Sequence, residues 1–140
     1  MKSTLDTYQV TRIQTAPRGH LVVILYDVMI KFLNRAVENI GQDNYSEYDK
    51  NIHKAQNVLS ELLAYLNIEE GGEISTSLYR LYRYFKTQLR EANQTHNKEK
   101  IKHMIGQTKE LRAAWNETAK AVRKTGQENF IAREILNFLA

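Results

Sequence analysis

The sequence predicts an all-α fold, an antiparallel four-helix bundle with an N-terminal arm and a short C-terminal fifth helix. Apolar residues recur at alternating steps of three and four along most of the chain, which is the spacing of one helix face. One proline and six glycines leave little room for the many turns of a β fold. Because the chain has no cysteine, disulfides, thiolate metal sites and cysteine catalysis are excluded.

The length and charge of the chain indicate its number of domains, its localisation and its class of partner. A chain of 140 residues is long enough for one domain, residues 1–140, with a core of its own. No stretch of about 18 apolar residues and no signal-peptide pattern occurs, so we expect a cytoplasmic protein without membrane insertion. The net charge of +4 is spread among 16 acidic residues, which is typical of a solvated mixed surface, and no nucleic acid partner is expected.

The first elements are an arm and the most apolar helix. Residues 1–17 are polar and sparsely apolar, and we expect them to form an arm that packs onto the bundle. Pro17 favours the start of a helix. The helix predicted from Arg18 to Ile40 carries an apolar stripe over more than half of its circumference, so it should be central, and Gly41 should end it.

A helical hairpin is expected next, from about Asn44 to Asn93. Its turn is placed at Gly71-Gly72, because glycine has the backbone freedom to end one helix and begin another. Ser46 and Asp49 resemble a capping box at its start. The apolar stripe of the first arm is Tyr48, Ile52, Ala55, Leu59, Leu62 and Leu66, and that of the second is Ile74, Leu78, Leu81, Tyr82, Phe85, Leu89 and Ala92.

Two helices remain. One should run from about Asn97 to Lys124 and close at Thr125-Gly126, which completes a four-helix core over residues 18–125. Residues 127–140 predict a short amphipathic helix that must dock on something, since a helix of about a dozen residues is marginal alone. Its apolar residues are Phe130, Ile131, Ile135, Leu136, Phe138 and Leu139.

The sequence nominates no catalytic or metal-binding residues. The four histidines, His20, His53, His96 and His103, include no pair four residues apart. No Glu-x-x-His motif, phosphate loop or nucleophile elbow occurs. We therefore expect no enzyme, no cofactor and no metal site.

Two features of the sequence suggest binding to a partner. A basic face flanked by tyrosines, from Arg80 to Arg90, suggests a nucleic acid or an acidic protein as partner. Tyr82 should however lie on the apolar stripe, so a solvated face with long basic side chains is favoured. The second feature is a surplus of apolar positions, which is either ordinary core or a groove for a partner's amphipathic helix.

Short stretches in a fixed order carry a resemblance to a known family. They are Tyr8-Gln9, Thr15-Ala16-Pro17, Leu25-Tyr26-Asp27, Phe32-Leu33 with Ala36, Lys54-Ala55-Gln56, Glu61-Leu62, Gly71-Gly72-Glu73-Ile74 with Leu78, Leu81-Tyr82, Leu89, Glu91-Ala92-Asn93, Leu111-Arg112 and Ala114-Trp115. The sequence thereby resembles the flagellar secretion chaperones, the FliS-type chaperones of flagellin. One departure is Val28, where the family often has glycine.

The resemblance implies an export chaperone that binds the disordered C-terminal segment of flagellin. Covering the amphipathic patches of that segment would prevent premature polymerisation and keep the flagellin competent for type III secretion in flagellum assembly. The flagellar export gate and other flagellar regulators are further candidate partners. The competing hypothesis is a basic helical adaptor that binds nucleic acid or acidic proteins through the Arg80 to Arg90 face.

The resemblance also implies a set of partner-binding residues. Tyr8 and Ile13 would form an arm over the groove. The residues that would line or support the groove are Tyr26, Asp27, Ile52, Ala55, Gln56, Leu59, Ile74, Leu78 and Tyr82. Each apolar member is equally well explained as core, because core and groove share one periodicity. Asp27 must face a polar partner or water.

The C-terminal stretch resembles the end of flagellin itself. Gln127-Glu128-Asn129 precedes the apolar run Ile135 to Leu139, and flagellins typically end in a similar order. We hypothesise that residues 127–140 occupy the cargo groove when flagellin is absent. A fifth bundle helix that never leaves is the alternative.

Overall fold

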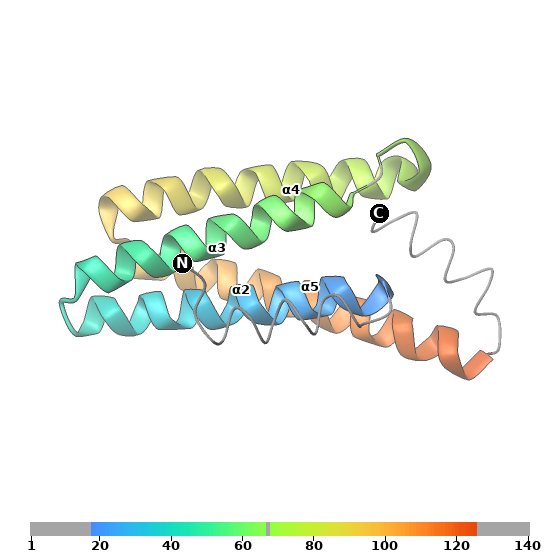
Figure 1. Cartoon of the computed structure of the whole chain (residues 1–140), viewed down its shortest axis with the longest axis horizontal. Helices are drawn as coiled ribbons and strands as arrows, with labels where there is room; N and C mark the ends of the chain where they lie inside the picture. Colours follow the sequence, from blue (N-terminus) through green and yellow to red (C-terminus); the bar gives the residue numbers. More distant parts are fainter. Residues whose placement is uncertain (1–17, 67, 126–140) are drawn as a thin grey trace.

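The computed structural model describes residues 18–66 and 68–125, and every regular element in these ranges is a helix (Figure 1). The helices are α2 (Arg18–Gly41), α3 (Tyr45–Tyr65), α4 (Ile68–Thr95) and α5 (Lys98–Thr125). The predicted all-α class and four helices are confirmed. The predicted arm at 1–17 and the fifth helix at 127–140 lie outside the described residues.

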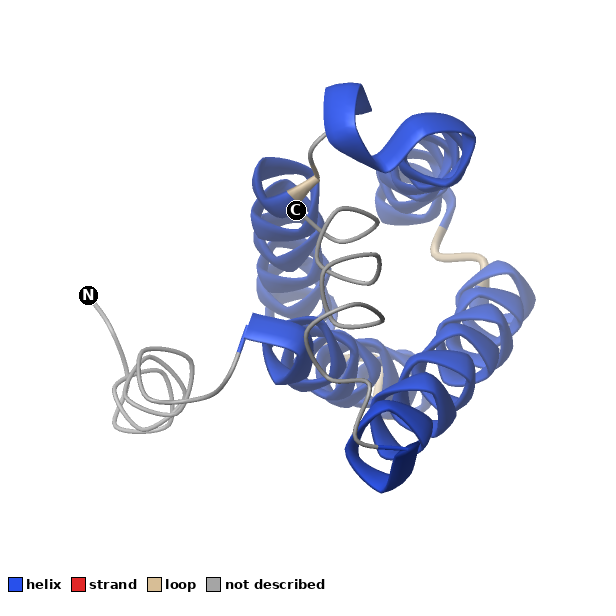
Figure 2. Cartoon of the chain, turned by 90° about the vertical axis from the view of Figure 1, so that its right-hand side faces the viewer, coloured by secondary structure: helices blue, strands red, loops and turns tan. Residues whose placement is uncertain are grey.

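The four helices form a ring in which each has two neighbours. Figure 1 shows that successive helices run in opposite directions, and Figure 2 looks along the bundle. The most extensive packing joins α2 to α3 and α2 to α5, whereas α4 packs on α3 and, least extensively, on α5. The ring therefore has α2 and α4 at opposite corners, and α4 is the least enclosed member.

The ends of the helices are set by local capping. Asn44 caps α3, since its side-chain oxygen accepts from the backbone N–H of Glu47 at 3.3 Å. The predicted capping box at Ser46 is therefore wrong, because Ser46 already lies inside the helix. At the start of α5, Asn97 accepts from the N–H of Lys100 at 3.2 Å. Asp43 and His96, with φ of 53° and 54°, take the left-handed conformation that these two tight connections require.

The predicted turn at Gly71-Gly72 is wrong. Helix α3 ends at Tyr65, Leu66 is extended with φ −74° and ψ 132°, and α4 begins at Ile68. Leu66 takes no left-handed geometry, and neither glycine lies between the two helices. Both glycines lie inside α4, where each costs about 1 kcal/mol relative to alanine. Burial of the remaining apolar face of α4 offsets that cost.

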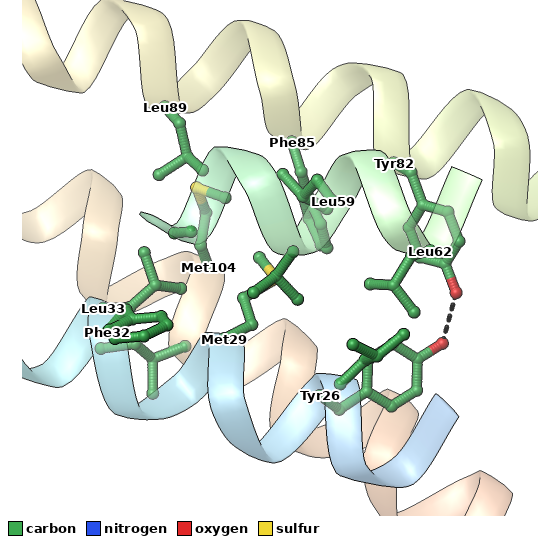
Figure 3. Close-up of a cluster of buried hydrophobic side chains, with 14 of the residues drawn as sticks. Tyr26, Met29, Phe32, Leu33, Leu59, Leu62, Tyr82, Phe85, Leu89 and Met104 are labelled. Atoms are coloured by element: carbon green, nitrogen blue, oxygen red, sulfur yellow. Dashed lines mark hydrogen bonds between the residues drawn. The ribbon is translucent and has the colours of Figure 1, made fainter. Parts of the chain in front are cut away.

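The core fills the space between the helices. Tyr26, Met29 and Leu33 on α2 face Leu59 and Leu62 on α3, Phe85 and Leu89 on α4, and Met104 on α5 (Figure 3). All of these side chains are at most 2% exposed. The wide apolar stripe predicted for α2 is confirmed, because all residues from Leu21 to Tyr26 are buried.

We expect Leu59→Ala to destabilise the bundle by about 2–5 kcal/mol, since Leu59 is fully buried and its truncation removes apolar contacts and leaves a cavity. Urea denaturation followed by circular dichroism measures the change. The matched control is Asn57→Ala on the exposed side of the same helix, with an effect below about 0.5 kcal/mol. Equal effects of the two substitutions would contradict this description of the core.

Candidate partner-binding site

A chain of buried hydrogen bonds joins three helices around Tyr26. The indole Nε1–H of Trp115 on α5 donates to the hydroxyl of Tyr26 on α2 at 3.0 Å. The same hydroxyl lies 2.5 Å from the hydroxyl of Tyr82 on α4 (Figure 3). Tyr26 and Tyr82 are each 1% exposed, so these bonds replace the water that the polar atoms lost on folding.

The same environment determines the protonation of the two phenols. Burial raises the pKa of Tyr26 to about 12, although its hydrogen bonds to Tyr82 and Trp115 act in the opposite direction. Burial also raises the pKa of Tyr82, and the nearby Tyr26 raises it further. Both phenols are therefore neutral at neutral pH and keep their protons for hydrogen bonding.

A charged pair lies next to this chain on the interface between α2 and α5. Arg112 donates through Nε to Oδ1 of Asp27, and through Nη2 to Oδ2 at 3.4 Å. The hydrogen bond and charge of Asp27 raise the pKa of Arg112. The two side chains are 39% and 41% exposed, so solvent screens the pair and it adds little stability. Asp27 thus faces a polar partner at the edge of the apolar core.

The interface between α3 and α4 carries a second polar link. Gln56 donates through Nε2 to the backbone carbonyl of Lys86 at 3.1 Å. Lys86 in turn donates through Nζ to the hydroxyl of Ser60 at 2.6 Å. These bonds hold α4 in register with α3.

The predicted partner-binding residues fall into three groups. Six are buried in the core: Tyr26, Ile52, Ala55, Leu59, Leu78 and Tyr82. Asp27 and Gln56 are half-buried. Tyr8, Ile13, the side chain of Ile74 and the tail residues Phe130, Ile131, Ile135, Leu136, Phe138 and Leu139 lie outside the described part. The structure places the six buried members in the shared interior of the helices and Asp27 and Gln56 at its edge, and their role in partner binding stays a prediction.

Sequence reasoning missed two residues that contact the predicted ones, Arg112 and Trp115. They lie three positions apart on α5, so they face the same side as Asp27 and Tyr26. Both fall in stretches that carry the family resemblance, and that resemblance was the available signal. The predicted site residues also did not include the apolar side chains that are half-buried at the edge of the core, although Leu66 and Leu81 were placed on the apolar stripes. These side chains are Val28, Ile30, Val37, Ile40, Leu63, Tyr65, Leu66, Leu81 and Leu111.

The site has the groups for packing and hydrogen bonding. Among the residues that the structure describes, no group of three or more His, Asp or Glu side chains is placed to hold a metal ion. No helix in the described ranges is long and apolar enough to cross a membrane. The described site residues form a buried apolar cluster, edged by the amide of Gln56 and the ion pair of Asp27 and Arg112.

Comparison with known proteins defines the class. The family model described as "Flagellar protein FliS" matches residues 1–122. A Bacillus subtilis relative named flagellar secretion chaperone FliS is 31% identical over 124 residues, which is 89% of this chain and 92% of the relative. Proteins of the same name from Campylobacter jejuni and Salmonella typhimurium are 30% and 29% identical, over 69% and 75% of this chain and 76% and 78% of their own lengths.

A helical bundle with this match over most of its length is a chaperone of flagellar protein export. The chain belongs to the FliS family. The resemblance read from the sequence is thereby confirmed.

We expect Tyr26→Phe to cost more stability than Tyr82→Phe. Removing the Tyr26 hydroxyl breaks its bonds to both Trp115 and Tyr82, whereas Tyr82→Phe leaves the bond from Trp115 in place. The expected losses are about 1–3 kcal/mol and about 1 kcal/mol. Fluorescence of Trp115, the single tryptophan of the chain, follows unfolding. Tyr84→Phe, at an exposed position, serves as control. A larger loss of stability for Tyr82→Phe than for Tyr26→Phe would contradict the central place of Tyr26 in the hydrogen-bond network.

We expect stability to fall in alkaline solution between pH 10 and pH 12. A tyrosine whose pKa is raised on folding contributes stability that is complete below its unfolded value of 10.0 and is lost as the pH rises through the folded value. Burial raises the pKa of both Tyr26 and Tyr48 to about 12. For Tyr26 alone this corresponds to about 2–3 kcal/mol.

Urea midpoints at pH 9 and pH 11.5 measure this dependence. Tyr26→Phe should be less sensitive to alkali than the parent chain, while lysine deprotonation affects both alike. Parallel pH profiles for the two proteins would show that Tyr26 does not contribute.

Proposed function

We propose that this chain is a cytoplasmic export chaperone that binds the disordered C-terminal segment of flagellin. In this role it prevents premature polymerisation and keeps flagellin competent for secretion during flagellum assembly. The observation that carries the proposal is the family match over residues 1–122, together with relatives named as flagellar secretion chaperones.

The physical basis is the binding of an amphipathic segment by an apolar helical surface. Segments that are unstructured alone and helical in an assembly bury their apolar faces against whichever surface is available. Ordering such a segment costs about 2–5 kcal/mol, which limits affinity and favours release at the point of export. This cycle needs neither a nucleotide nor a metal ion.

The burial pattern supports two different roles for the site residues, one for the buried side chains and one for the half-buried ones. The buried members, such as Tyr26, Leu59 and Tyr82, hold the helices in place as a support. The half-buried apolar side chains, including Leu81 on α4 and Leu111 on α5, supply the surface on which cargo packs. Asp27 and Gln56 lie where polar groups of a partner meet that surface. The arm residues Tyr8 and Ile13 keep their proposed role over the groove.

Residues 127–140 enter the proposal as a competitor for the cargo surface. Their similarity to the end of flagellin and their apolar side chains, Phe130, Ile131, Ile135, Leu136, Phe138 and Leu139, would let them occupy it while flagellin is absent. The alternative is a fixed fifth helix, and in that case a chain without residues 127–140 should not bind flagellin more tightly.

Calorimetric titration with a peptide of the flagellin C-terminal segment tests both ideas. We expect the whole chain to bind, and a chain that ends at Thr125 to bind more tightly because the competitor is removed. No binding by either chain would overturn the proposed function. Equal affinities would overturn only the competitor role of the tail.

Substitutions on the proposed cargo surface can be tested in the same titration. Leu81→Glu and Leu111→Glu should each weaken peptide binding about tenfold or more, since each places a charge against an apolar partner. Gln94→Glu, exposed near the end of α4, adds the same charge and should leave binding unchanged. Binding should also tolerate salt, because burial of apolar area drives it.

A further inference from the structure

The outward face of α4 carries a row of basic side chains held in a fixed orientation. The inward face is defined by Leu78, Tyr82, Phe85, Leu89 and Ala92, all at most 8% exposed. Because the helix cannot rotate without exposing these residues, Arg80, Arg83 and Arg90 are directed to the outside, and all three are exposed.

These three arginines have no ion-pair partner among the residues that the structure describes. No acidic residue occurs from Ser75 to Arg90, and the next one, Glu91, is bound by Lys100 at 2.7 Å. Lys86 is turned aside to Ser60. Exposed faces of the other helices mix both signs, as Glu99, Lys102, Lys109 and Glu110 do on α5. From Ser75 to Arg90 the charged side chains of α4 are therefore all basic, and exposed Glu91 follows directly after Arg90.

Two exposed tyrosines lie among the arginines. Tyr79 is 39% exposed and Tyr84 is 49% exposed, and they are two of the three most exposed large hydrophobic side chains in the described part. Tyrosine and arginine are the residue types enriched at the energetic centres of protein interfaces, whereas lysine is depleted there. We refer to Tyr79, Arg80, Arg83, Tyr84 and Arg90 as the α4 basic face.

The dimensions of this face favour a short acidic protein segment over a nucleic acid. At 1.5 Å per residue, Arg80 and Arg90 lie about 15 Å apart along the axis, and the three arginines fall within about 80° of arc. Three guanidinium groups over that length contact few phosphates, whereas nucleic-acid binding usually rests on many such contacts. Guanidinium groups also pair with carboxylates in a bidentate manner.

We propose that the α4 basic face docks an acidic segment of a second protein. Its carboxylates pair with Arg80, Arg83 and Arg90, and its apolar side chains lie on Tyr79 and Tyr84. This inference goes beyond the proposed binding of flagellin. The arginines of this face point away from the core, on the side of α4 opposite to its buried residues.

The test is fluorescence anisotropy of the full chain with a labelled acidic helical peptide of about four turns, with glutamates at spacings of three and seven and leucines between them. We expect R80E/R83E/R90E to weaken peptide binding at least tenfold. The control variant K98E/K102E/K109E makes the same change in net charge on exposed positions of α5 and should change affinity less than about threefold. Y79A/Y84A should also weaken binding, which pure electrostatics would not produce.

Three outcomes would overturn the proposal: equal loss in the two charge-reversed variants, tighter binding of a single-stranded oligonucleotide than of the peptide, or no binding of the peptide. Circular dichroism checks the fold of each variant, and R80Q/R83Q/R90Q replaces the reversal if it fails to fold. Titration of R80E/R83E/R90E with the flagellin peptide should give the parent affinity. If the flagellin peptide does not bind, the proposed function is contradicted. If only the acidic peptide does not bind, the proposed role of the α4 basic face is contradicted.

Discussion

The structure depends on covering helix α2. The consecutive residues Leu21 to Tyr26, which point to every side of the first turns of α2, are all buried, whereas Asn34, Arg35 and Glu38 further along the helix are exposed. The contacts of α2 with α3 and α5 are the most extensive in the bundle, and α4 lies at the opposite corner of the ring. At this corner α4 has a buried inner face, which includes Tyr82, Phe85 and Leu89, and an exposed outer face.

Polar contacts then select one arrangement among those that apolar packing allows. Apolar side chains pack in many registers, whereas the hydroxyl of Tyr26 meets Trp115 and Tyr82 in only one relative placement of α2, α4 and α5. The links from Asp27 to Arg112 and from Gln56 to Lys86 act in the same way at neighbouring interfaces. A surface that recognises a partner by shape needs helices fixed in register, and these bonds supply that constraint.

Much of the fold was predictable from the sequence, because helix periodicity and end residues are local. The bounds of α2 and α5 agree closely with those expected. The turn before α4 was placed wrongly because glycine permits a turn without requiring one, and both glycines lie inside α4. The site was harder, since the same spacing describes a core leucine and a groove leucine. No spacing rule could pair Asp27 with Arg112, because that contact arises only when α2 and α5 meet.

The two faces of α4 differ in how substitution can change them. Tyr82 and Phe85 are fully buried and contribute to the packing of the whole ring, so the inner face tolerates little change. Arg80, Arg83 and Arg90 make no ion pair within the described residues, so their presence is not explained by the stability of the bundle. A helix that is constrained on one side and free on the other can hold cargo-binding elements in place while it presents a separate recognition surface. The unpaired positive charge and exposed tyrosines on that surface are better explained by a partner than by folding.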